Sequence, residues 1–245
     1  LIIGLLAFIF LKGLLWANLV PFFQGPDETS HYSYALIWAQ TFESPTELAP
    51  QELDEIHQEV FPLFNDYDAF TVRFNPLNRP SYNLDIEDNS IVPPDWGAAN
   101  QVFCAHYCAY LNPPLYYALI SPIFWISDSL VTQMSLARLI SVLLFVGFAW
   151  VAYQFFERFF ENKGRALSAT IALSLIPTLN FIFAVVNNDV LVNTLFALFF
   201  AASLYVISKK QWSMHLTLGM VAIAVLLIFT KIQGLMILPF LLLLL

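Results

Sequence analysis

The sequence has few charged residues, and most of its charges are acidic. Charged side chains make up 11% of the 245 residues and apolar ones 59%, and the formal net charge is −8. Soluble domains carry roughly 25% charged and 45–50% apolar residues. The composition therefore excludes a soluble enzyme, a disordered tail and a nucleic-acid-binding protein.

In place of charge, the sequence has long apolar runs, and its mean hydropathy is +0.69. About 20 apolar residues cross a bilayer as a helix, so we expect an all-α integral membrane protein, a polytopic helical bundle of about six spans. The first run lacks the short core and cleavage site of a secretory signal. Because the chain starts at Leu1 and ends in five leucines, we expect a fragment with a truncated last span. The predicted spans are 1–23, 135–156, 166–186, 190–207, 212–229 and 235–245.

The acidic residues are concentrated in one segment between the first and second predicted spans. Residues 24–112 hold 14 of the 18 acidic residues and only two of the ten basic ones, and 24–114 hold ten of the 14 prolines. A segment of this length usually has a function or a small structure of its own. We expect residues 24–134 to form one large acidic loop, whose charge disfavours binding to nucleic acid or anionic headgroups.

Within that loop, residues 115–127 form an apolar run that is too short to span a bilayer and contains Pro122. We expect a juxtamembrane helix lying in the interface. This reading places both short basic connectors, 157–165 and 208–211, on one side of the membrane and the acidic loop on the other. Because short basic loops favour the cytoplasmic side, the prediction is a multi-pass cell-membrane protein with an extracytoplasmic loop.

Three polar points fall on the outer side in this arrangement: Asp27-Glu28, Asn188-Asp189 and Lys231. Asp27 caps a helix over 28–40, acts as a general base, or does both, since the two roles are compatible. Asp189 either caps the fourth span or lines a site. Lys231, like Arg138 at the start of the second span, either snorkels to the interface or binds a phosphate.

Five stretches together resemble the GT-C superfamily of membrane glycosyltransferases, in particular the protein O-mannosyltransferase and aminoarabinose-transferase-like branch. They occur in the order found in that family and cover most of the chain outside the middle of the acidic loop. The stretches are Pro26-Asp27-Glu28-Thr29-Ser30-His31, Asn112-Pro113-Pro114-Leu115-Tyr116-Tyr117, Ala137-Arg138-Leu139-Ile140-Ser141, Asn187-Asn188-Asp189-Val190-Leu191 and Thr230-Lys231-Ile232-Gln233-Gly234-Leu235.

The resemblance implies a glycosyltransferase that moves a sugar from a polyprenyl-phosphate donor to an acceptor on the extracytoplasmic face. Asp27 would be the catalytic base and Glu28 would support the pocket. Asp189 would line it, and Arg138 and Lys231 would be partners of the donor phosphate. The family often has Lys or His before the double proline, where this chain has Asn112, so Lys231, Arg138 or His106 would bind the phosphate.

Other readings stay open. Without a cation at Asn112, the chain is alternatively a non-catalytic GT-C-like subunit that scaffolds a larger membrane complex. A transporter would need broken helices and buried ionisable groups, for which Lys12 and Pro177 are the only signs. His31 and Glu28 could assist a divalent metal, although no motif requires one. Cys104 and Cys108 are free, bridged by a disulfide or, with His106, part of a metal site.

Overall fold

The computed structural model describes residues 1–25, 27–66, 109–209 and 213–244. Within these ranges the chain forms helices joined by turns, without strands. This agrees with the predicted all-α class. The predictions for Cys104, His106 and Cys108 concern residues outside the described ranges.

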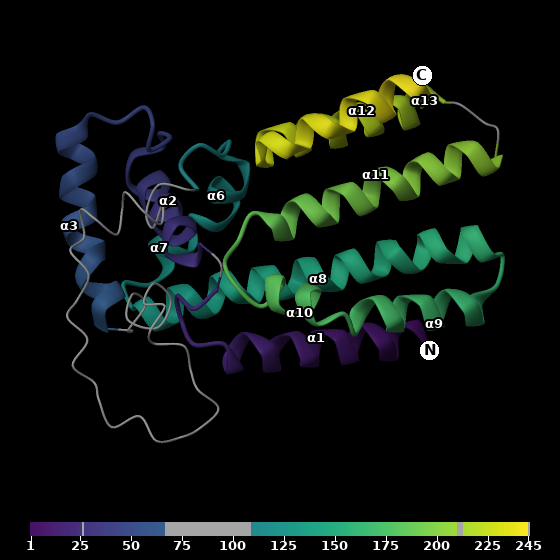
Figure 1. The fold of residues 1–245 in the computed structure, drawn as a ribbon, viewed down its shortest axis with the longest axis horizontal. Coiled ribbons are helices and arrows are strands. Elements are labelled where there is room, and N and C mark those ends of the chain that lie inside the picture. Colours follow the sequence, from purple (N-terminus) through teal and green to yellow (C-terminus); the bar gives the residue numbers. More distant parts are fainter. Residues whose placement is uncertain (26, 67–108, 210–212, 245) are drawn as a thin grey trace, which may run out of the picture.

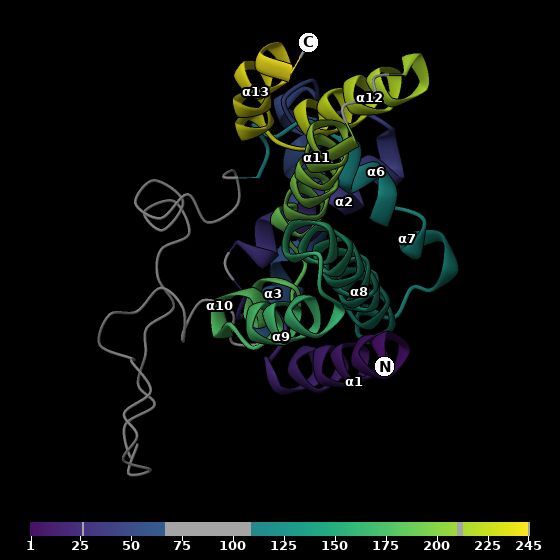
Figure 2. The same cartoon turned by 90° about the vertical axis from the view of Figure 1, so that its right-hand side faces the viewer.

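The long helices lie side by side in one bundle (Figure 1). Helix α8 has the most extensive contacts and packs against α1, α9 and α11, while α12 packs on α11. The end-on view in Figure 2 shows the same order, with α1 on one side of α8 and α11 and α12 on the other. The bundle consists of α1 (Ile2–Leu19), α8 (Leu130–Phe160), α9 (Lys163–Ser174), α10 (Pro177–Ile182), α11 (Asp189–Lys209), α12 (Met214–Thr230) and α13 (Ile237–Leu244).

Three helices of the described residues are long and apolar enough to cross a membrane: Ile2–Leu19, Leu130–Phe160 and Asp189–Ser208. They correspond to the predicted spans 1–23, 135–156 and 190–207. Helix α8 has 31 residues and is about 46 Å long, which exceeds a hydrocarbon core of about 30 Å. The predicted span 212–229 is the shorter helix α12, and 235–245 is replaced by the 3₁₀ turn η1 (Ile232–Met236) and α13.

The predicted span 166–186 is not one helix. It divides into α9 and α10 because Pro177 has no N–H group and holds Ile176 in an extended conformation. The break leaves the carbonyl of Ser174 without a helical partner, and it accepts hydrogen bonds from the Lys12 ammonium and the Asn180 amide. The lysine inside the first apolar run thus has a partner at the broken helix.

The remaining helices form a head at one end of the bundle (Figure 1). The predicted interfacial helix 115–127 is present as two pieces separated by Ser121 and Pro122. Tyrosines and aliphatic residues of the head pack with the start of α8 into one apolar core. The head comprises α2 (Glu28–Thr41), α3 (Pro50–Asp66), α6 (Leu115–Ile120) and α7 (Ile123–Ile126).

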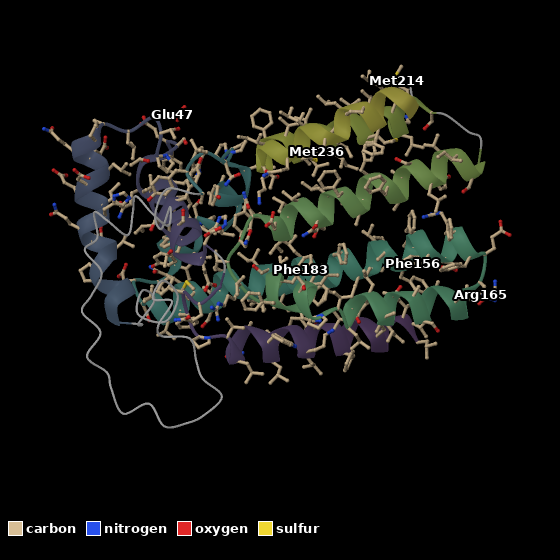
Figure 3. All side chains as sticks on the ribbon, viewed as in Figure 1. Glu47, Phe156, Arg165, Phe183, Met214 and Met236 are labelled. Atoms are coloured by element: carbon tan, nitrogen blue, oxygen red, sulfur yellow. The ribbon has the colours of Figure 1, made fainter. Side chains whose placement is uncertain are left out.

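Figure 1 shows that the segments next to the head include the end of α1, the start of α8, the turn between α10 and α11, and the end of α12. The basic connector 157–165 lies at the opposite end, where Figure 3 labels Arg165. The polar residues that follow or precede the long helices are therefore gathered beneath the head.

Candidate functional site

A buried ion pair lies where the head meets the bundle. Glu28, the first residue of α2, has no exposed surface and accepts hydrogen bonds from Arg138 Nε at 2.9 Å and Arg138 Nη2 at 2.8 Å. The backbone N–H of Val186 adds a third hydrogen bond at 2.9 Å. The carboxylate thereby joins α2, α8 and the turn between α10 and α11.

The guanidinium of Arg138 also caps the C-terminal end of α1. Its remaining N–H groups donate to the carbonyl oxygens of Ala17, Val20 and Pro21 at 2.8, 2.5 and 2.9 Å. Helix ends leave such carbonyls without partners. Because all five donors of Arg138 are used, this residue holds the first helix and the head together and has no donor left for a phosphate in this conformation.

The turn between α1 and α2 is tightly constrained. Phe23 and Asp27 both have left-handed backbones, with φ of 63° and 52°, a conformation that costs energy for residues other than glycine. Between them Gly25 packs so closely that an added Cβ would lie 2.7 Å from the Cβ of Val185. The turn therefore fixes where Asp27 stands.

The structure does not support the prediction that Asp27 caps the following helix. The helix begins at Glu28 as expected and ends at Thr41, but the Asp27 side chain makes no capping hydrogen bond. The left-handed conformation at Asp27 departs from the extended backbone that such caps use. Asp27 is instead exposed and directed to a pocket.

A polar pocket of about 150 Å³ lies under the head. Five of the predicted site residues line it, and they come from four separate parts of the chain: the turn before α2 together with the first turn of α2, the segment before α6, the start of α11 and the residue that follows α12. The convergence predicted for Asp27, Asp189 and Lys231 is present in the geometry. The lining residues are Asp27, His31, Ala109, Asn112, Asn187, Asp189, Lys231 and Gln233.

An ion pair forms one side of this pocket. Lys231 Nζ donates to Asp189 Oδ1 at 2.5 Å, and the two side chains are 20% and 34% exposed. Asp189 stands in the first turn of α11, where the helix dipole favours a carboxylate. The lysine, which was predicted as a phosphate partner, therefore already holds a counter-ion.

Close packing fixes the position of Lys231. After α12 the chain turns through η1, in which Gly234 N donates to the Lys231 carbonyl oxygen at 2.8 Å. A Cβ on Gly234 would lie 2.3 Å from the carbonyl oxygen of Leu227. Only glycine permits this approach, which also brings Gln233 to the pocket.

Aromatic rings form the wall behind the pocket. His31 Nδ1 lies 2.9 Å from the hydroxyl of Tyr117, and the two rings are stacked. The Tyr117 ring stacks in turn on Tyr34, with centroids 3.7 Å apart. Burial raises the pKa of Tyr117 well above its ordinary value of 10, and the neighbouring Tyr34 and Tyr116 add to the rise. The Tyr117 hydroxyl is therefore neutral and orients the His31 ring.

The turn before α11 completes the site. Tyr116 accepts a hydrogen bond from Asn187 N at 3.0 Å, and Asn187 Oδ1 accepts one from Asp189 N at 2.8 Å. Asn188, which was predicted at the outer-side turn together with Asp189, is fully buried and donates to the Thr230 carbonyl at 3.4 Å. This bond ties the start of α11 to the end of α12, so Asp189 and Lys231 are held in register.

Sequence reasoning did not single out Asn187 and Gln233 as site residues, although both flank predicted ones. Conversely, Glu28 and Arg138 do not line the polar pocket. No three His, Cys, Asp or Glu side chains of the described residues are grouped as metal ligands. The carboxylate of Glu28, proposed as a metal neighbour, is occupied by Arg138 and backbone N–H groups.

The arrangement provides carboxylates, an imidazole, amides and a lysine within one small pocket at one end of the helical bundle. Comparison with known proteins adds no further constraint. No family model matches the chain, and no curated protein or solved structure matches it either.

Proposed function

We propose that the chain is a GT-C-type glycosyltransferase that transfers a sugar from a polyprenyl-phosphate donor to an acceptor, with Asp27 as general base. The observation that carries the proposal is the polar pocket shared by Asp27, His31, Asn112, Asp189 and Lys231. Each of these residues belongs to a stretch that resembles a motif of the family. Their meeting at one pocket supports a common role.

The depth of the pocket suits a lipid-linked donor. The lipid tail of such a donor lies in the hydrocarbon core and its phosphate lies at the interface. Asp27 follows α1, the first candidate membrane helix, and Lys231 follows α12. The proposed chain crosses the cell membrane about six times, with α9 and α10 counted together as one crossing. Its head lies on the extracytoplasmic side.

In the proposed reaction Asp27 accepts the proton of the acceptor hydroxyl as its oxygen attacks the anomeric carbon. A carbon–oxygen bond forms to the acceptor while the bond from the anomeric carbon to the phosphate oxygen breaks. The polyprenyl phosphate leaves with the electron pair, and Lys231 stabilises its negative charge. His31 and the amides of Asn112, Asn187 and Gln233 are placed to bind sugar hydroxyls.

The direct test is sugar transfer from a radiolabelled polyprenyl-phosphate sugar in proteoliposomes. Positioned acid–base catalysis is worth roughly 10²–10⁴-fold, so Asp27→Asn should lower turnover by about that factor. Asp128→Asn is the matched control, because Asp128 is exposed and does not line the pocket. Equal turnover in both variants, with equal thermal stability, would exclude Asp27 as the base.

A second candidate function is a non-catalytic subunit that keeps this fold and scaffolds a membrane complex. It is favoured by the pairing of both candidate phosphate partners, Arg138 with Glu28 and Lys231 with Asp189. Purification of the complete protein from native membranes distinguishes the two. The subunit reading requires stoichiometric partner chains and no transfer by the wild type with any polyprenyl-phosphate sugar, whereas the enzyme reading requires transfer.

A further inference from the structure

A second hollow, of about 360 Å³, lies between α8, α11 and α12, far from the polar pocket. It is near the end of the bundle that carries the basic connector 157–165, where Figure 3 labels Phe156, Arg165 and Met214. We call it the basic-end groove. Its lining residues are Trp150, Val151, Gln154, Arg158, Leu198, Ala201, Ala202, Tyr205, Leu216 and Ile223.

The groove is apolar along most of its length and polar at one end. On α11 it extends from Leu198 to Tyr205, and on α8 from Trp150 to Arg158. At 1.5 Å per residue each of these stretches is about 10–12 Å long. That is somewhat less than half of a hydrocarbon core of about 30 Å. The groove therefore has the length and chemistry for part of one acyl chain within a single leaflet.

The polar end of the groove presents a cation. Arg158 is exposed, and its guanidinium lies 5.0 Å from the centre of the Tyr205 ring. Among the described residues no carboxylate forms an ion pair with Arg158, since the nearby Glu157 faces Lys163 at 4.0 Å. A guanidinium at the mouth of an apolar groove is complementary to the phosphate of a lipid headgroup.

We propose that the basic-end groove binds an anionic phospholipid of the leaflet at the basic end of the bundle. One acyl chain packs against Leu198, Ala202 and Ile223, and the headgroup phosphate binds Arg158. By the positive-inside rule this is the cytoplasmic leaflet, which carries the anionic lipids that attract basic clusters. The lipid fills the space between α8 and α12 and stabilises the bundle independently of any reaction at the polar pocket.

The test is the thermal stability of detergent-purified full-length protein titrated with phosphatidylglycerol or with phosphatidylcholine of the same acyl chains. Phosphatidylglycerol should raise the melting temperature at lower concentration than phosphatidylcholine. Arg158→Gln should raise the phosphatidylglycerol concentration needed for the same increase in melting temperature about fivefold. This factor corresponds to the typical contribution of one basic residue to binding at an anionic lipid surface. Arg165→Gln removes an exposed charge from the same end without touching the groove and should leave the response unchanged.

A second variant tests the groove itself. Ala202→Phe fills the apolar part and leaves Arg158 in place, so it should abolish the response to both lipids. Native mass spectrometry should show one retained phosphatidylglycerol in the wild type and none in this variant. The proposal is overturned if Arg165→Gln weakens binding as much as Arg158→Gln, which would indicate general surface attraction. It is also overturned if the two lipids act equally, or if Ala202→Phe retains the lipid.

Discussion

Glu28 and Arg138, 110 positions apart in the sequence, are joined by two charge-assisted hydrogen bonds of 2.9 and 2.8 Å inside the protein. Neither side chain is more than 2% exposed. The pair holds the start of α2 against α8, and Arg138 also holds the end of α1 through three carbonyls. It therefore fixes the base of the turn that carries Asp27.

Replacing Arg138 by Met should strongly destabilise the protein. The carboxylate of Glu28 would stay buried without its counter-ion, and the carbonyls of Ala17, Val20 and Pro21 would lose their donor. Breaking a buried pair on one side costs about 3–5 kcal/mol. The free energy of unfolding in mild detergent, measured by denaturant titration, checks this.

The control for that experiment is Arg165→Gln, because Arg165 is exposed and makes no side-chain ion pair among the described residues. Its effect should remain within about 0.5 kcal/mol. The double variant Glu28→Leu/Arg138→Met removes both charges and should be less destabilised than Arg138→Met alone. If the double variant had a lower free energy of unfolding than Arg138→Met alone, the description of the pair would be contradicted.

Gly234→Ala should disturb the pocket from outside its lining. The added methyl group would lie 2.3 Å from the carbonyl oxygen of Leu227, so η1 must move and carry Lys231 and Gln233 with it. Gly219→Ala, within α12, meets nothing within 4 Å and should be neutral or stabilising by up to about 1 kcal/mol. The melting temperature and the transfer rate are measured for both variants. Equal melting temperatures and equal transfer rates in Gly234→Ala and Gly219→Ala would contradict the tight packing at Gly234.

Asp189→Asn should strengthen donor binding if Lys231 receives the donor phosphate. The aspartate neutralises the lysine at 2.5 Å, so removing its charge frees the cation for a competing anion. We expect a lower KM for the polyprenyl-phosphate sugar in Asp189→Asn and a higher KM in Lys231→Met. A raised KM in Asp189→Asn would show that the carboxylate serves the substrate directly.

His57 should make the stability of the head depend on pH. It is buried on α3, with Nε2 2.7 Å from the Tyr110 hydroxyl. Burial lowers its pKa below the ordinary value of 6.5, against a smaller opposing effect of Asp54. The neutral form is thus favoured in the folded state, so its contribution is complete above pH 6.5 and is lost as the pH falls toward the lowered pKa.

The measurement is thermal unfolding at several pH values between 7.5 and about 5. His57→Gln cannot titrate in this range and should lose less stability on acidification than the wild type. Other groups titrate in both proteins, so the difference between the two profiles isolates His57. Parallel profiles would contradict the prediction.

Several features of the fold could be predicted from the length of the apolar runs and from composition. The first, second and fourth apolar runs are long helices because nothing in them interrupts the backbone hydrogen bonds. The run 166–186 was wrongly predicted as one helix because hydropathy does not register the missing N–H of Pro177. The helix 115–127 was likewise divided at Pro122.

The sequence predicted which segments meet at the site, but it did not predict which of their side chains face the pocket. Topology alone placed Asp27, Asp189 and Lys231 at one end, and they line one pocket. The sequence does not show that Arg138 would face Glu28 and not the pocket, because helix rotation depends on packing against α1. The αL backbone of Asp27 and the approach of Gly234 to Leu227 also depend on tertiary contacts.

The pocket joins Asp27 to Lys231, which lie about 200 residues apart in the chain. During synthesis the first of these leaves the ribosome long before the second. Helices α1, α8 and α11 are therefore synthesised before the pocket can assemble. The pocket is complete only when α12 and η1 have docked, so premature termination before residue 231 leaves a product without Lys231 and Gln233.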